Sequence, residues 1–309
     1  MKMFLTNNKI ITKVTTFLII ILAYANQFYA KDDDCKKRDS CCHKSENSIR
    51  FEHIGINVKD PITAARWYSE NLNMKILREG TAPNYSTFVA DSSIHMMIEF
   101  NYNKDFPTID SLNFNYDSFH LAFCVFNINM IKEKLLNAGA TVLSDLRKTD
   151  SGDQVLVLKD PWGLPIQFVQ RVKPMINAEG IFIEHIAFNV SDSPAKSKWY
   201  VNNLNMEIMR EGKAPSFGMF IADENKNVMF EFYQHQDSPV INFNDITHST
   251  LHVAFVVQDI KALKEKLLTN EAELVNDIYQ TPSGDYVMNF KDSTGLPLQF
   301  VSRVKPMLK

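Results

Sequence analysis

The chain of 309 residues is long enough for two ordinary domains, each with its own hydrophobic core. Hydrophobic residues make up 45% and charged residues 22%, which is the balance of a soluble globular protein. The net charge of −3 provides no basic surface of the kind that binds nucleic acid, so we expect no DNA or RNA partner.

Residues 1–30 have the features of a secretory signal peptide. Lysines precede an apolar run over residues 14–25, and small residues follow at Ala25 and Ala30. Because the run is short for a bilayer span, we expect export to the periplasm or medium, no stable membrane span, and cleavage after Ala30 or Ala25. Loss of three lysines would lower the net charge to −6. A retained membrane anchor is the alternative.

Residues 31–49 form a polar leader without hydrophobic periodicity. It contains Cys35, Cys41 and Cys42. Clustered cysteines in an oxidising compartment bind a metal or form intermolecular disulfides. A linker with incidental cysteines fits the same composition, and the spacing does not decide between these interpretations.

The rest of the chain is a tandem repeat. Landmarks such as Glu52-His53-Ile54 return further along, here as Glu184-His185-Ile186, always at the same offset and with no insertion between them. We expect two domains, residues 50–175 and 182–307. Each domain divides again, because a short strand beginning with histidine occurs four times at nearly equal spacing. These strands begin at His53, His120, His185 and His252.

Each quarter predicts one strand, one helix and three further strands. In the first quarter Asp60-Pro61 begins a helix after the strand at 53–58, and strands follow near 74–79, 85–90 and 96–100. The second quarter has a helical pattern from Ile128 to Ala138, with Gly139 as its C-cap. Its strands are expected from 120, near 141–146, near 154–158 and near 164–169.

Strand alternation places polar side chains opposite the apolar face of each sheet. Four residues of the first repeat have side chains that ligate metals, each on a different strand, and the second repeat has the same set. The residues are His53, Glu99, His120, Gln167, His185, Glu231, His252 and Gln299. Nitrogen and oxygen donors of this kind suit a divalent ion such as Ni, Co, Fe, Mn or Zn. A polar pocket without metal is the alternative.

This arrangement of ligands on four strand-helix-three-strand units resembles the vicinal oxygen chelate superfamily. That superfamily includes glyoxalase I, extradiol dioxygenases and bleomycin-binding proteins. The resemblance covers residues 50–307 and implies an α+β fold. It predicts tandem domains, each made of two βαβββ modules in a curved, partly closed mixed sheet. Its architecture is specific, but the fold supports many chemistries.

The ligand set departs from bacterial glyoxalase I at one position, where Gln167 and Gln299 replace a glutamate. The ligand set also resembles that of methylmalonyl-CoA epimerase, in which the amide and the acid ligand stand in the reverse order. The resemblance therefore implies that a glutamine is compatible with a bound metal. The family's arginine on the first strand is Asn57 here, which argues against a glutathione-type substrate. Ring cleavage is also not expected, because Val157 and Asn289 stand where extradiol dioxygenases have a tyrosine.

The resemblance predicts a metal-dependent lyase or isomerase that acts on a small oxygen-rich substrate. Glu99 and Glu231 are then the expected catalytic bases, because an amide at the fourth position cannot accept a proton. The alternative function is a non-catalytic protein that sequesters a small molecule or metal, and a single working domain is a further possibility. Arg78 and Arg210 are either contacts for an anionic substrate or solvated strand-end arginines.

The sequence leaves the pairing of modules open. His53 and Glu99 share a metal either with His120 and Gln167 of their own repeat, or with His252 and Gln299 of the other repeat.

Overall fold

The computed structural model describes residues 48–176 and 178–309, which belong to one compact unit, Glu46–Lys309. The predicted signal peptide (1–30) and the three leader cysteines lie outside the described residues. Each repeat supplies two modules. The elements of the first repeat are β1 (Ile49–Asn57), α2 (Pro61–Leu72), β2 (Lys75–Arg78), β3 (Thr87–Ala90), β4 (Met97–Asn101), α3 (Ile109–Leu112), β5 (Phe119–Cys124), α4 (Ile128–Asn137), β6 (Thr141–Lys148), β7 (Gln154–Lys159) and β8 (Pro165–Gln170).

The second repeat has the same order of elements. They are β9 (Phe182–Asn189), α5 (Ser193–Leu204), β10 (Glu207–Glu211), β11 (Met219–Ala222), β12 (Met229–Tyr233), the 3-10 helix η1 (Phe243–Asp245), β13 (Leu251–Val257), α6 (Ile260–Leu268), β14 (Glu273–Gln280), β15 (Tyr286–Lys291) and β16 (Pro297–Ser302). We call β1–β4 module 1, β5–β8 module 2, β9–β12 module 3 and β13–β16 module 4.

The predicted strand-helix-three-strand order is present in all four modules. The first strand begins at Ile49 rather than His53, because Ile49 and Phe51 are buried and pair with Val257 and Phe255 of β13. The polar composition before residue 50 concealed this extension. The short helices α3 and η1 were not predicted, since elements of this length are too short to show a helical period.

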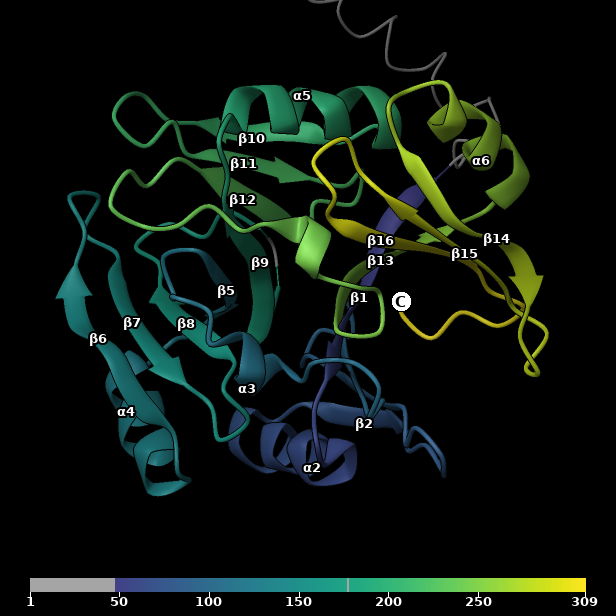
Figure 1. The fold of residues 1–309 in the computed structure, drawn as a ribbon. Coiled ribbons are helices and arrows are strands. Elements are labelled where there is room, and N and C mark those ends of the chain that lie inside the picture. Colours follow the sequence, from purple (N-terminus) through teal and green to yellow (C-terminus); the bar gives the residue numbers. More distant parts are fainter. Residues whose placement is uncertain (1–47, 177) are drawn as a thin grey trace, which may run out of the picture. The chain divides into compact units, whose positions relative to one another are not determined.

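The strands form two open, mixed sheets of eight strands each, which confirms the α+β class (Figure 1). Sheet 1 has the order β14-β15-β16-β13-β1-β4-β3-β2, and sheet 2 has the order β10-β11-β12-β9-β5-β8-β7-β6. Module 1 therefore pairs with module 4, and module 2 pairs with module 3. The two repeats exchange modules, which decides the alternative that the sequence left open.

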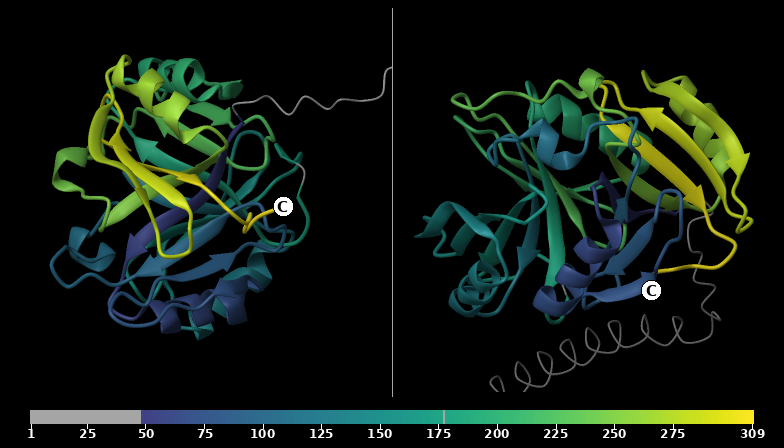
Figure 2. Two further views of the ribbon diagram at one scale, coloured as in Figure 1. Left: turned by 90° about the vertical axis from the view of Figure 1, so that its right-hand side faces the viewer. Right: turned by 60° about the horizontal axis from the view of Figure 1, so that its bottom comes forward.

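Helices α2 and α4 of the first repeat contact each other and so link its two modules. The Asp60 side chain caps α2 by accepting from the Thr63 amide, and Pro61 occupies the first helical turn. The Trp67 Nε1–H of α2 donates to the Ala138 carbonyl at the end of α4, at 2.8 Å. Figures 1 and 2 show α5 and α6 on one side of the molecule and α2 and α4 on the other, with strands of both repeats in each sheet.

The main hydrophobic core lies on the helix-covered faces of the sheets and includes residues of all four modules. The opposite face of sheet 1 carries a small separate apolar cluster that includes Phe88, Ala90 and Met97. This division follows the predicted alternation, since Ile98 belongs to the main core whereas its neighbour Met97 does not. The polar residues predicted to bind metal are thus on the face away from the helices.

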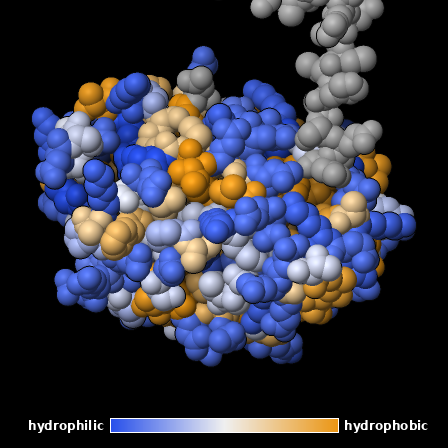
Figure 3. All heavy atoms as spheres, turned by 90° about the horizontal axis from the view of Figure 1, so that it is seen from above, coloured by the Kyte–Doolittle hydropathy of each residue, from blue (hydrophilic) through white to orange (hydrophobic). Residues whose placement is uncertain are grey.

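Among the described residues, no helix combines the length and the apolar character that a membrane crossing requires. The face drawn in Figure 3 is mostly hydrophilic, with apolar residues in small separate groups.

Candidate metal centres

Two clusters of histidine and glutamate lie on these polar faces. Site 1 consists of His53, Glu99 and His252, and site 2 consists of His120, His185 and Glu231. In each site the candidate ligand atoms lie within 4.8 Å of one another. Each site takes residues from both repeats, because each lies across the junction of two modules.

Strand register brings the residues of site 1 together. Gly55 of β1 pairs with His252 of the antiparallel β13 and with Glu99 of the parallel β4. A Cβ atom at Gly55 would come within 2.0 Å of the His252 ring, so the imidazole occupies the space that a side chain would fill. Glycine at this position therefore allows His252 to reach His53. Ala187 is the counterpart in site 2, where it pairs with His120.

The candidate ligand atoms of site 1 are close enough to surround one ion. His53 Nε2 lies 3.2 Å from His252 Nε2 and 3.2 Å from Glu99 Oε2, and His252 Nε2 lies 3.6 Å from the same oxygen. Two nitrogen lone pairs at this distance repel each other unless a proton or cation lies between them. The second oxygen of Glu99 accepts a hydrogen bond from the Ser86 hydroxyl.

The ring nitrogens that face away from site 1 are held by other groups. His53 Nδ1–H donates to Glu52 at 3.0 Å, and His252 Nδ1–H donates to the His248 carbonyl at 2.7 Å. Such contacts fix the neutral tautomer that has its lone pair on Nε2, as groups behind the ligands do at metal sites. Arg303 in turn donates to both oxygens of Glu52, at 2.7 and 2.6 Å, and to Asp285 at 2.9 Å.

Site 2 repeats this arrangement with small differences. His185 Nε2 lies 3.1 Å from Glu231 Oε2, and apart from this carboxylate the buried nitrogen has no partner within the described part of the chain. The outward nitrogens bond to Glu184 (3.0 Å) and to the Tyr116 carbonyl (2.9 Å), and Arg171 binds Glu184. Site 2 has no hydroxyl equivalent to that of Ser86, because the corresponding residue is Gly218.

Both sites combine imidazole with ionised carboxylate. Burial, together with a neighbouring histidine, lowers the pKa of His252 and of His120 to about 4. Burial by itself raises the pKa of Glu99. The hydrogen bonds and charges of His53, His252 and Ser86 outweigh this effect and lower the pKa to about 2. Burial also lowers the pKa of His53, but the two carboxylates beside it outweigh burial and raise it, so a cation would take the place of a proton there. Imidazole nitrogens and a carboxylate suit a divalent metal of the borderline class, and the residues therefore fit the group that the sequence predicted.

The two glutamines lie close to the sites, but their amide nitrogens rather than their oxygens make the contacts in the described residues. The Gln167 amide donates to His120 Nε2 at 2.6 Å, and the Gln299 amide nitrogen points to Asn289 Oδ1 at 3.4 Å. Their roles as metal ligands stay predictions, as do those of the histidines and glutamates.

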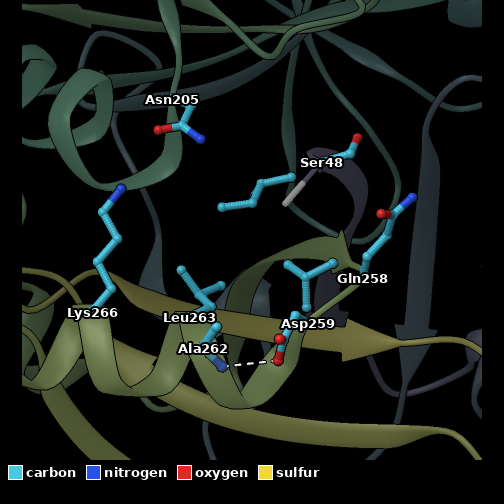
Figure 4. A pocket seen from close by; sticks show the side chains of 9 residues that line it. Ser48, Asn205, Gln258, Asp259, Ala262, Leu263 and Lys266 are labelled. Carbon is cyan, nitrogen blue, oxygen red and sulfur yellow. Dashed lines mark hydrogen bonds between the residues drawn. The ribbon is translucent and has the colours of Figure 1, made fainter. Parts of the chain in front are cut away.

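A cavity of about 570 Å³ opens above site 1. It is lined by His53, Glu99 and Gln299 from the predicted set, and also by residues that strand alternation did not single out, among them Arg303, Ser86 and Tyr279. The cavity drawn in Figure 4 is different and much smaller, about 70 Å³, and lies at the start of α6, where Asp259 caps the Ala262 amide. It contains no histidine or glutamate.

Comparisons with known proteins agree with this architecture. The profile of the Glyoxalase/Bleomycin resistance protein/Dioxygenase superfamily matches residues 50–168 and 182–300. A search of curated proteins gave no match.

Solved structures show the same fold at low sequence identity. Glyoxalase I from Zea mays has a TM-score of 0.65 at 18% sequence identity, and the match covers 83% of this chain and 93% of that one. A variant of the same enzyme has a TM-score of 0.66 at 19% identity, with 83% of this chain and 94% of the variant covered. A provisionally named dioxygenase from Bacillus subtilis has a TM-score of 0.60 at 11% identity over 84% and 86%. The chain belongs to the Glyoxalase/Bleomycin resistance protein/Dioxygenase superfamily, as a member with two tandem copies of the family's unit.

Proposed function

We propose that the protein is an exported, divalent-metal-dependent lyase or isomerase that acts on a small oxygen-rich substrate. The observation that carries this proposal is the convergence of two imidazole Nε2 atoms and a carboxylate beneath the cavity of site 1. Membership of the superfamily supports a metal-dependent, glyoxalase-like function.

The residues that would hold the ion are His53, Glu99 and His252 in site 1, with Gln299 also lining the cavity. In site 2 they are His120, His185 and Glu231, beside Gln167. When bound, the ion would polarise neighbouring substrate oxygens and acidify the carbon next to them.

We assign proton transfer to Glu99 and Glu231. Each carboxylate is ionised and lies beside the imidazoles of its site, whereas the glutamine at the fourth position cannot accept a proton. The pocket residues around Glu99 include buried Phe88, so a substrate that fills the cavity displaces water and makes the carboxylate a stronger base.

The test combines metal analysis with proton exchange. The full chain, purified with supplemented metal, is analysed for bound ions and then incubated with small α-hydroxy ketones in D₂O. We expect up to two ions per chain and metal-dependent deuterium incorporation at carbon, followed by NMR. A protein without bound metal that still binds small molecules would support the sequestering function instead. N-terminal sequencing of the mature protein tests export, and a mature protein that begins at Met1 would refute it.

A further inference from the structure

One arginine in each site lies over an aromatic ring next to the candidate ligands. The Arg78 guanidinium is 4.1 Å from the ring centroid of Phe88, and Arg210 has the same separation from Phe220. Phe88 also meets the His53 ring edge-to-face, with centroids 5.3 Å apart. The stacking fixes the position of the guanidinium one aromatic ring away from a candidate metal ligand.

The donors of these arginines are unused. Within the described residues, neither Arg78 nor Arg210 makes a hydrogen bond or an ion pair, in contrast to Arg303 and Arg171, whose donors bind two carboxylates each. A guanidinium stacked on a ring through its face keeps its N–H groups free at the edge. Arg78 therefore presents unpaired donors.

These donors face the same space as site 1. Arg78 lines the cavity together with His53 and Glu99. Burial lowers its pKa, and the charge of Glu99 acts in the opposite direction, which places the guanidinium within the field of the site. In site 2, Phe220 beneath Arg210 likewise meets the His185 ring edge-to-face, with centroids 5.5 Å apart. Arg78 is the exposed last residue of β2, so its guanidinium is open to solvent and also lines the cavity of site 1.

We propose that Arg78, and Arg210 in site 2, bind a carboxylate of the substrate, so that the substrate is a small hydroxy or keto acid. This inference rests on the proposed function, since the metal would bind the other oxygens. The guanidinium fork matches the two oxygens of a carboxylate. A doubly charged phosphate fits site 1 less well, because Glu79 and Glu99 also line the cavity and Arg303 is already neutralised by Glu52 and Asp285.

Two probes test this inference in the full chain loaded with Co²⁺. Acetohydroxamic acid is uncharged in neutral solution and chelates through two oxygens, and succinate monohydroxamate adds a carboxylate to the same chelating group. Substituting His120→Ala and His185→Ala confines binding to site 1. Affinities are measured by calorimetry and by the visible spectrum of the cobalt.

We expect the carboxylated probe to bind more tightly than the neutral one, and Arg78→Ala to abolish that preference, a loss of about 10- to 100-fold. Affinity for the neutral probe should stay the same, which also shows that the variant is folded. Arg78→Lys should keep part of the preference. Lys75→Ala is the matched control, because Lys75 is an exposed cation on the same strand that does not line the cavity.

The outcomes separate the two proposals. If the chain binds Co²⁺ and acetohydroxamate but shows no preference for the carboxylated probe, or keeps the preference in Arg78→Ala, the carboxylate inference is wrong and the metal site stands. If neither Co²⁺ nor acetohydroxamate binds, the proposed function fails and this inference fails with it.

Discussion

His53 and His252 are 199 residues apart in the sequence, yet their Nε2 atoms lie 3.2 Å from each other. The contact exists because β1 pairs with β13 and not with β5, although β5 begins with the same kind of histidine motif. Each candidate metal site is consequently made by both repeats.

This pairing predicts which double variants lose one metal and which lose two. His53→Ala with His252→Ala removes two ligands of site 1 only, so the chain should still bind one ion. His53→Ala with His120→Ala damages both sites and should remove both ions. Elemental analysis after dialysis measures the difference, and the reverse pattern would mean that modules pair within a repeat.

Replacing the two site glutamates tests their proposed role as bases. Glu99→Gln with Glu231→Gln leaves an amide oxygen that can still ligate a metal. The double variant should retain much of its metal and lose roughly 100-fold or more in deuterium exchange, which is the usual scale of general-base catalysis. Full exchange with metal retained would place the base elsewhere.

The hydrogen bond from Ser86 predicts that Glu99 and Glu231 differ in basicity. Its hydroxyl donates to Glu99, whereas Gly218 offers no hydroxyl to Glu231. A hydrogen bond to a carboxylate favours the ionised form, so Ser86→Gly should raise the pKa of Glu99 and move the acidic limb of the exchange rate to higher pH. The profile is recorded in the chain with site 2 disabled.

Gly218→Ser is the reciprocal change, and a Cβ at this position meets nothing within 4 Å. With site 1 disabled by His53→Ala and His252→Ala, it should move the acidic limb of site 2 to lower pH. Identical profiles before and after both substitutions would show that the hydroxyl does not influence the base.

Asp160 and its counterpart Asp292 should respond differently to the same substitution. Asp292 is paired with the buried ammonium of Lys196 at 2.7 Å, and Tyr200 donates to it at 2.8 Å. Asp160 accepts an equivalent bond from Tyr68, but Ala64 stands where Lys196 would be. Asp292→Asn leaves a buried unpaired cation and should lower the free energy of unfolding by about 3–5 kcal/mol. Urea denaturation measures it.

The effect of Asp160→Asn should depend on pH. Burial raises the pKa of Asp160 from 3.8 to about 6. Between these values the folded state binds more protons than the unfolded state, so this group lowers the free energy of unfolding as pH rises through the window. The wild-type chain should therefore lose up to about 3 kcal/mol relative to Asp160→Asn between pH 4 and pH 7. A difference that is constant with pH would contradict the assignment.

The tandem repeat and the strand alternation were sufficient to predict the modules, and they singled out the histidines and glutamates that the structure brings together. Module pairing was not predictable, because β5 and β13 carry nearly the same pattern and bury the same kind of face. Glu52 was missed for a different reason. Alternation puts it on the face opposite His53, but a bulge in β1 at this position lets its carboxylate reach the His53 ring.

The exchange of modules between covalently joined repeats has a consequence for how the two sites are maintained. A dimer of half-length chains would lose both sites on dilution, and its symmetry would force every substitution into both at once. In this chain the sites form at any concentration, and each position exists once. The difference between the counterparts Ser86 and Gly218 is an example of a substitution that belongs to one site only.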